Sequence, residues 1–221
     1  MVFSFDSLQG KSGDVTCRPT NRRIRRMMAR GSCMGLAMGP PCGTYCIACR
    51  PAKRTKQFLM GVPWLSDKDR EKVEAANRVT AAALHILEWA TFHGIPWICE
   101  NPQTSLLWRL PRMRRLCRRA GAIPVLVHQC GYGTPWKKAT IFMCFNIADP
   151  SRLEKLCRPV GNHLCVHSGL PHHTLQGSVN GQARTARAAA YPPKLCDQIA
   201  KVLVDTAWCR EFSASGLPDV K

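Results

Sequence analysis

With 221 residues, the chain is long enough for one domain with a substantial hydrophobic core. Its formal net charge of +18 favours a polyanionic partner, because phosphates neutralised by Lys and Arg release counterions. Its thirteen cysteines are scattered and no charged-then-apolar leader opens the chain, so we expect an intracellular protein, nuclear or cytoplasmic, with reduced thiols. The most apolar long window, residues 80–99, is broken by Gly94 and Pro96, which argues against a membrane span.

Composition divides the chain into four segments. Residues 1–30 are polar and then basic, and we expect a partly disordered start followed by a short basic helix. Residues 31–149 carry most of the apolar runs and form the predicted catalytic core. Residues 150–183 combine Cys and His with Gly and Pro, which predicts an irregular insertion. Residues 184–221 are expected to form a closing segment with a C-terminal amphipathic helix.

Three apolar runs of the core each lead into a polar or turn-forming group. Residues 34–38 precede Gly39-Pro40-Pro41-Cys42, residues 95–99 precede Glu100-Asn101-Pro102, and residues 122–127 precede a Gly/Pro turn over residues 131–135. Such runs are typical of buried strands in open α/β sheets, whose carboxyl ends border the ligand-binding crevice. We therefore expect a thiol, a carboxylate and a Gly/Pro turn to meet at one edge of a sheet.

Two helices and one more strand complete the predicted core. Ser66 opens the clearest helix, with Asp67 in its first turn, and Gly94 ends it. Residues 111–120 predict a basic helix without acidic residues, on which we expect Arg112 and Arg115 to face phosphates. A strand is predicted over residues 140–145. These elements predict an α/β fold: a partial Rossmann-like sheet with helices on both faces.

The residues that follow the strands resemble the motifs of the DNA cytosine-5 methyltransferases. Gly39-Pro40-Pro41-Cys42 is similar to the nucleophile motif of that family, and Glu100-Asn101 is similar to its acid motif. Residues 132–140, which read YGTPWKKAT, are similar to the next motif, and residues 184–200 to the closing segment. The resemblance spans about residues 31–205. It implies a class I S-adenosylmethionine-dependent methyltransferase sheet and methyl transfer to carbon 5 of cytosine in DNA.

The resemblance also implies roles for the matched residues. Cys42 is the expected nucleophile, Glu100 is expected to contact nitrogen 3 of the base, and Gly39 and Pro40 are expected to border S-adenosylmethionine. The remaining matched residues are expected beside the base or the DNA backbone: Pro41, Asn101, Pro102, Tyr132, Lys137 and Lys138.

These residue types suit the chemistry without the family. Carbon 5 of cytosine is a poor nucleophile until a group adds to carbon 6, and a thiolate can both add and leave. A carboxyl can then stabilise the ring by donating a proton to its nitrogen 3 side. The base must leave the duplex stack to reach such a pair, which requires a basic groove.

Three departures from the family predict a divergent or N-terminally truncated member. Residues 1–30 lack a glycine turn that could cradle the methyl donor, so a partner chain is a candidate source of the donor-binding half. The Gln-x-Arg-x-Arg pattern of the family reads Trp136-x-Lys138-x-Thr140 here, which loses bidentate arginine contacts. Residues 146–183 leave little room for a target-recognition domain.

Two alternatives come from other classes of protein. Cys42, Cys46 and Cys49 have the spacing of the three-cysteine iron–sulfur loop of radical S-adenosylmethionine enzymes. A non-catalytic nucleic-acid-binding module with a structural zinc is the second alternative. Its candidate ligands are Cys157, Cys165, His167 and either His172 or His173.

Overall fold

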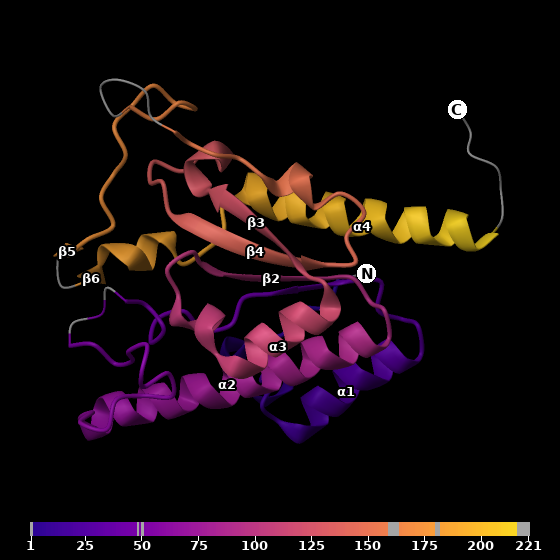
Figure 1. Ribbon diagram of the computed structural model, residues 1–221, viewed down its shortest axis with the longest axis horizontal. Helices are drawn as coiled ribbons and strands as arrows, with labels where there is room; N and C mark the ends of the chain where they lie inside the picture. Colours follow the sequence, from indigo (N-terminus) through magenta and orange to yellow (C-terminus); the bar gives the residue numbers. More distant parts are fainter. Residues whose placement is uncertain (1, 48, 50, 159–163, 180–181, 216–221) are drawn as a thin grey trace.

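A computed structural model describes residues 2–47, 49, 51–158, 164–179 and 182–215 (Figure 1). The α-helices are α1 (Arg18–Ala29), α2 (Asp67–Phe92), α3 (Pro111–Ala120) and α4 (Pro193–Ser215). The strands are β1 (Leu36–Met38), β2 (Trp97–Pro102), β3 (Ile123–His128), β4 (Ala139–Phe145), β5 (Ser178–Val179) and β6 (Gln182–Ala183). Short 3-10 helices are η1 (Ser7–Ser12), η2 (Leu106–Arg109), η3 (Gln129–Tyr132), η4 (Pro150–Leu153) and η5 (Arg184–Ala188).

The four longer strands form one mixed sheet in the order β1-β2-β4-β3. Strands β1 and β2 are parallel, whereas β4 is antiparallel to both β2 and β3. It follows that β1, β2 and β3 all run in the same direction and end at the same edge of the sheet. The α/β class is confirmed, and the three segments that we expected to meet do leave the sheet at a common edge.

Helices cover both faces of this sheet, as predicted. Helices α1, α2 and α3 lie on one face and α4 on the other (Figure 1). The alternation of side chains along β2 explains the two layers, because Trp97 and Cys99 pack with the first group of helices and Ile98 packs with α4. Among the described residues, no helix has both the length and the apolar character that a bilayer crossing requires.

The helix boundaries follow the local signals in the sequence. The Ser66 hydroxyl accepts a hydrogen bond from the Asp69 N–H at the start of α2, and Gly94 beyond its end has a φ of +65°. Residues 7–12 form η1, where we expected disorder, and the Thr20 hydroxyl of α1 donates to the Lys11 carbonyl. This bond ties η1 to α1, and Ile24 and Met28 of α1 pack in the core with Leu87 of α2.

Strand β2 is longer at its carboxyl end than the sequence indicates. Glu100, Asn101 and Pro102 pair with Phe142, Ile141 and Thr140 of β4, so the expected loop is a continuation of the strand. Strand β1 stops earlier, because its last residue, Met38, pairs with Cys99. Glu100 therefore lies on a strand just beyond the end of its parallel neighbour.

The loop between β1 and α2 is held by the buried side chain of Arg54. Its guanidinium donates to the Thr44 hydroxyl, to the Leu59 carbonyl at 2.6 Å and to the Asn77 side-chain oxygen at 2.8 Å. It also lies 3.8 Å from the centroid of the Tyr45 ring. One cation thus ties together the loop that follows Cys42 and the side of α2.

We expect Arg54→Ala to lower the free energy of unfolding by about 3 kcal/mol, because it leaves several partly buried acceptors and the buried Val73 carbonyl without a donor. Lys56→Ala removes an exposed cation from the same loop and should change it by less than about 0.5 kcal/mol. Urea unfolding followed by circular dichroism measures both. An equal effect of the two variants would contradict the structural role of Arg54.

Candidate functional site

The loop that carries Cys42 is fixed to the sheet directly after β1. The Asn101 side-chain amide donates to the Pro40 carbonyl at 2.9 Å, and the Tyr45 N–H donates to the Cys42 carbonyl at 3.0 Å. The Asn101 bond is buried, and proline fixes φ within the turn. Cys42 is half-buried, and its position is set by contacts on both sides.

Glu100 is a buried carboxyl group, 7 % exposed, that faces the same edge of the sheet. The Tyr191 hydroxyl donates to Glu100 Oε2 at 2.9 Å, and among the described residues Oε1 has no hydrogen-bond partner. A Cβ atom at Gly39 would lie 2.7 Å from the Tyr191 hydroxyl oxygen. Gly39 is therefore the residue that lets Tyr191 reach Glu100.

The pKa values of Cys42 and Glu100 depend on burial and on nearby charges, including that of Lys138. Burial raises the pKa of Cys42, the positive charge of Lys138 lowers it, and the negative charge of Glu100 raises it. Burial also raises the pKa of Glu100, against the opposing effects of Lys138 and of the Tyr191 hydrogen bond. Lys138 Nζ is held in place by donating to the Ala188 carbonyl at 2.7 Å.

The structure thus brings together three residues predicted from the sequence, namely Cys42, Glu100 and Lys138, and adds Tyr191. Asn101 acts by fixing the Cys42 loop, since its amide binds the Pro40 carbonyl. The role of Tyr191 was not predicted, and its position in the closing segment was the only signal in the sequence that could have indicated it.

Other predicted DNA-binding residues have structural partners. The Tyr132 hydroxyl is buried and donates to the Leu153 carbonyl at 2.8 Å, so this ring belongs to the core. Arg112 donates two hydrogen bonds to the Glu88 carboxylate of α2, at 2.8 and 2.6 Å. Both side chains thus have a role in the fold, and their contacts with DNA stay a prediction.

The remaining predicted contact residues lie near the site or on the opposite face of the sheet. Pro41 is half-buried beside Cys42, and Pro102 ends β2, where its carbonyl accepts from the Trp108 ring nitrogen. Lys137 precedes Lys138 at the start of β4. Arg115 is exposed on α3, which covers the face away from α4.

The described residues do not form a cradle for S-adenosylmethionine. The space beside Gly39 is taken by the Tyr191 hydroxyl, and the Pro40 carbonyl is bonded to Asn101. In the described sheet, β1 is an edge strand, so no neighbouring strand and glycine turn adjoin it there. The expectation that Gly39 and Pro40 border the methyl donor gains no support from these contacts.

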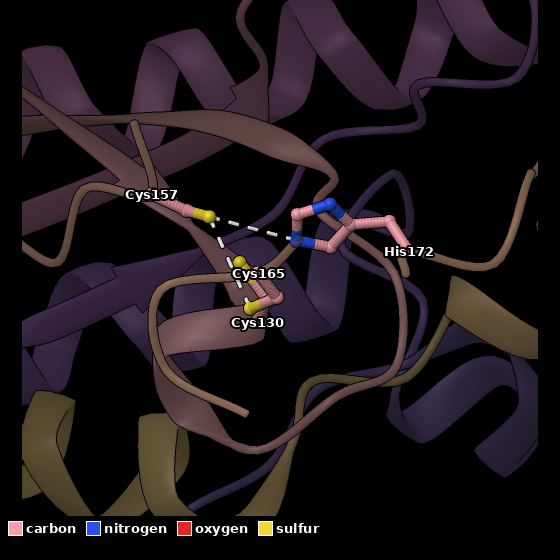
Figure 2. A group of neighbouring side chains, drawn as sticks. All are labelled: Cys130, Cys157, Cys165 and His172. Atoms are coloured by element: carbon pink, nitrogen blue, oxygen red, sulfur yellow. Dashed lines mark hydrogen bonds between the residues drawn. The ribbon is translucent and has the colours of Figure 1, made fainter. Parts of the chain in front are cut away.

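A second group of side chains gathers beyond the end of β3 and could hold a metal ion. Their ligand atoms all lie within 4.8 Å of one another, and Figure 2 shows them converging from separate segments: Cys130, Cys157, Cys165 and His172. The three cysteines are buried and His172 is partly exposed. Cys157 Sγ lies 3.9 Å from Cys165 Sγ and 3.6 Å from His172 Nε2.

Three of the predicted metal ligands, Cys157, Cys165 and His172, belong to this group. His167 is not among the four, and Cys130, which follows β3 much earlier in the chain, takes that place. The other candidate, His173, donates its backbone N–H to the Pro135 carbonyl at 2.7 Å.

Backbone pairing brings these ligands to the end of β3. His128 donates its N–H to the Lys155 carbonyl at 2.8 Å, and its ring Nδ1 accepts from the Cys157 N–H at 2.8 Å. A tight turn joins the Cys165 N–H to the Leu170 carbonyl. Burial raises the pKa of Cys165, but hydrogen bonds from the residues of this turn outweigh that effect and lower it below its ordinary value.

The iron–sulfur alternative stays a hypothesis. The group of possible metal ligands found among the described residues does not include Cys42, Cys46 or Cys49, although the Cys46 and Cys49 side chains share a hydrogen bond. Comparisons with protein-family models, with curated proteins and with solved structures found no match for this chain.

We expect Lys138→Gln to slow alkylation of Cys42 by iodoacetamide about tenfold at neutral pH, because loss of the cation raises the thiol pKa. The pH profile of alkylation, followed by mass spectrometry of the Cys42 peptide, should move to higher pH. Lys137→Gln is the matched control and should leave the profile in place. Identical pH profiles for Lys138→Gln and Lys137→Gln would contradict an effect of the Lys138 charge on the pKa of Cys42.

Proposed function

We propose that this protein acts on cytosine in DNA through covalent addition of Cys42 to carbon 6 of the base. The observation that carries the proposal is the buried carboxyl of Glu100, whose Oε1 has no partner among the described residues, beside Cys42 and Lys138. A cytosine presents an amino group and nitrogen 3 on its Watson–Crick edge, and both can share a proton with that oxygen.

The addition step needs one thiolate and one acid. The Cys42 thiol first gives its proton to solvent, and its sulfur then forms a bond to carbon 6. The electron pair of the double bond between carbons 5 and 6 forms a double bond between carbons 4 and 5, and the pair of the double bond between carbon 4 and nitrogen 3 takes the proton that Glu100 gives. The product is an enamine whose carbon 5 is nucleophilic. Protonation of carbon 5 and loss of the original proton, followed by expulsion of Cys42, exchange the carbon 5 hydrogen with solvent.

The electrostatics of the site support these roles. A carboxyl whose pKa is raised by burial keeps its proton to higher pH, as a proton donor to the base must. Lys138 opposes the burial effect at Cys42 and so increases the fraction of thiolate. Tyr191 donates to Oε2 of Glu100, and Oε1 keeps its capacity to bond the base because it has no partner among the described residues.

DNA is the proposed partner because of the charge of the whole chain. A net charge of +18 supplies sequence-independent affinity for phosphates and helps to hold an extruded base. Exposed arginines of α3 are available for such contacts: Arg114, Arg115, Arg118 and Arg119. A thiol nucleophile also suits a reducing, intracellular compartment, and we propose that location.

Methyl transfer, the activity that the resemblance implies, requires a donor site that we assign to a partner chain. The three co-directional strands and the site at their carboxyl ends support a partial Rossmann-like methyltransferase sheet. S-adenosylmethionine supplies a methyl group to carbon 5 when it is bound. The residues of this chain contribute the nucleophile and the proton donor.

A nucleic-acid-binding module with a structural zinc is the second candidate function. The cluster of Cys130, Cys157, Cys165 and His172 supports it, since three thiolates and one imidazole are a common ligand set of structural zinc. In this alternative the basic surface binds DNA and Cys42 carries out no reaction.

Hydrogen exchange at carbon 5 tests the proposed function without a methyl donor. We expect the protein to release tritium from DNA that contains 5-tritiated cytosine, and Cys42→Ala to abolish the release. Cys196→Ala, an exposed cysteine of α4, is the control and should exchange normally. Equal release by wild type and Cys42→Ala would remove Cys42 from the mechanism. DNA binding by wild type without any release would favour the non-catalytic alternative.

The role of Tyr191 predicts a pH shift with a definite sign. Tyr191→Phe removes a hydrogen bond to the Glu100 carboxylate, so the pKa of Glu100 should rise further. Because the protonated acid then persists to higher pH, the falling limb of the exchange rate should move to higher pH. Tyr132→Phe removes a buried hydroxyl away from Glu100 and should leave that limb unchanged. Movement to lower pH would contradict the role of Glu100 as acid.

A further inference from the structure

The loop that carries Lys138 is hydrogen-bonded to Gln129 and His173, which are sequence neighbours of Cys130 and His172 in the Cys/His cluster. We infer that a zinc ion in this cluster is a clamp, which holds residues 133–138 against the end of β3 and so positions Lys138 at the Cys42 site. The inference rests on the role proposed for Lys138, but the metal site itself does not.

The geometry of the cluster fits a four-coordinate zinc ion. Zinc–sulfur bonds of about 2.3 Å at tetrahedral angles put two sulfur atoms about 3.8 Å apart, and a sulfur and an imidazole nitrogen about 3.5 Å apart. The observed separations from Cys157 Sγ are 3.9 Å to Cys165 Sγ and 3.6 Å to His172 Nε2. They are far longer than the S–S bond of a disulfide, about 2.05 Å. Four protein ligands leave no open position, which is typical of a structural site.

One side of the clamp is formed by Gln129, the residue before the ligand Cys130. Its backbone N–H donates to the Lys137 carbonyl at 2.9 Å, and its side-chain Oε1 accepts from the Trp136 ring nitrogen at 3.1 Å. Gln129 is fully buried, so these bonds are shielded from water. A metal ion that fixes Cys130 therefore also fixes the end of the loop next to Lys138.

The other side of the clamp is formed by His173, the residue after the ligand His172. Its backbone N–H donates to the Pro135 carbonyl at 2.7 Å. Cys130 and His172 lie on opposite sides of the loop in the sequence, and one ion bound to both would join them. The ion would thus hold the loop from both sides. Lys138 lies at the carboxyl end of this loop, and its Nζ donates to the Ala188 carbonyl.

His128 is a positioning residue for this site. Its ring Nδ1 accepts the Cys157 N–H at 2.8 Å, which fixes the backbone of one ligand to the last residue of β3. The arrangement attaches the metal site to the sheet, so movement of the cluster is transmitted to the loop that leads into β4.

Metal content of the full-length protein tests the site. We expect wild type and Cys196→Ser, purified without added metal or chelator, to contain one zinc ion per chain, and Cys130→Ser to contain far less. Replacement of zinc by cobalt(II) in wild type should give the intense visible absorption of tetrahedral thiolate coordination. Wild type without zinc, or a weak octahedral cobalt spectrum, would overturn the metal site.

The pH profile of Cys42 alkylation tests the clamp. Removal of zinc from wild type with a chelator should move the profile to higher pH and slow alkylation several-fold at neutral pH, because Lys138 is no longer held. Addition of zinc should restore the profile, which excludes irreversible unfolding. A reversible loss of zinc with an unchanged profile would overturn the clamp. If the zinc content and the reversible shift of the alkylation profile are as expected but wild type releases no tritium, only the proposed reaction is overturned.

Discussion

One buried hydrogen bond, from the Asn101 side chain to the Pro40 carbonyl, joins the two segments on which the candidate site depends. Its donor is on β2 and its acceptor is in the loop after β1, and the parallel register of Met38 with Cys99 brings the two within 2.9 Å. Because the bond is buried, the Asn101 amide and the Pro40 carbonyl cannot replace it with hydrogen bonds to water without a loss of free energy. The loop therefore has one favoured position. The thiol of Cys42 is thus fixed relative to Glu100 by the backbone of the sheet.

Tyr191 depends in turn on Gly39, which lies in the same short loop. A side chain at position 39 would collide with the Tyr191 hydroxyl, and Glu100 would then lose its only hydrogen-bond donor among the described residues. Burial of a carboxyl group is costly when it is charged, and one hydrogen bond with Lys138 nearby offsets only part of that cost. The remaining penalty is what raises the pKa of Glu100 and makes it suited to give up a proton.

Local signals in the sequence predict most of the fold and part of the site. Apolar runs followed by Gly or Pro indicate the strands, and Ser66 and Gly94 mark the ends of α2. The continuation of β2 was missed because its pairing partner, β4, lies about forty residues away. Cys130 was missed for a similar reason: β3 brings it to ligands that follow much later, and its own neighbours do not distinguish it from a buried structural cysteine. The pairing of Arg112 with Glu88 could not be predicted because the two residues are on different helices.

Burial of both reacting groups is compatible with the proposed addition because the site need not change its net charge. Over the whole step, the thiol of Cys42 loses one proton and nitrogen 3 of the base gains one. The net result is that the base gains sulfur at carbon 6 and hydrogen at nitrogen 3. Because solvent takes the thiol proton before the addition and returns one to Glu100 after it has protonated the base, both the carboxyl and Cys42 pass through charged forms only transiently. Burial raises the pKa of both groups and so favours their protonated forms before the base arrives. Lys138 lowers the pKa of both groups and so favours their anionic forms, which is why its position matters to the proposed reaction.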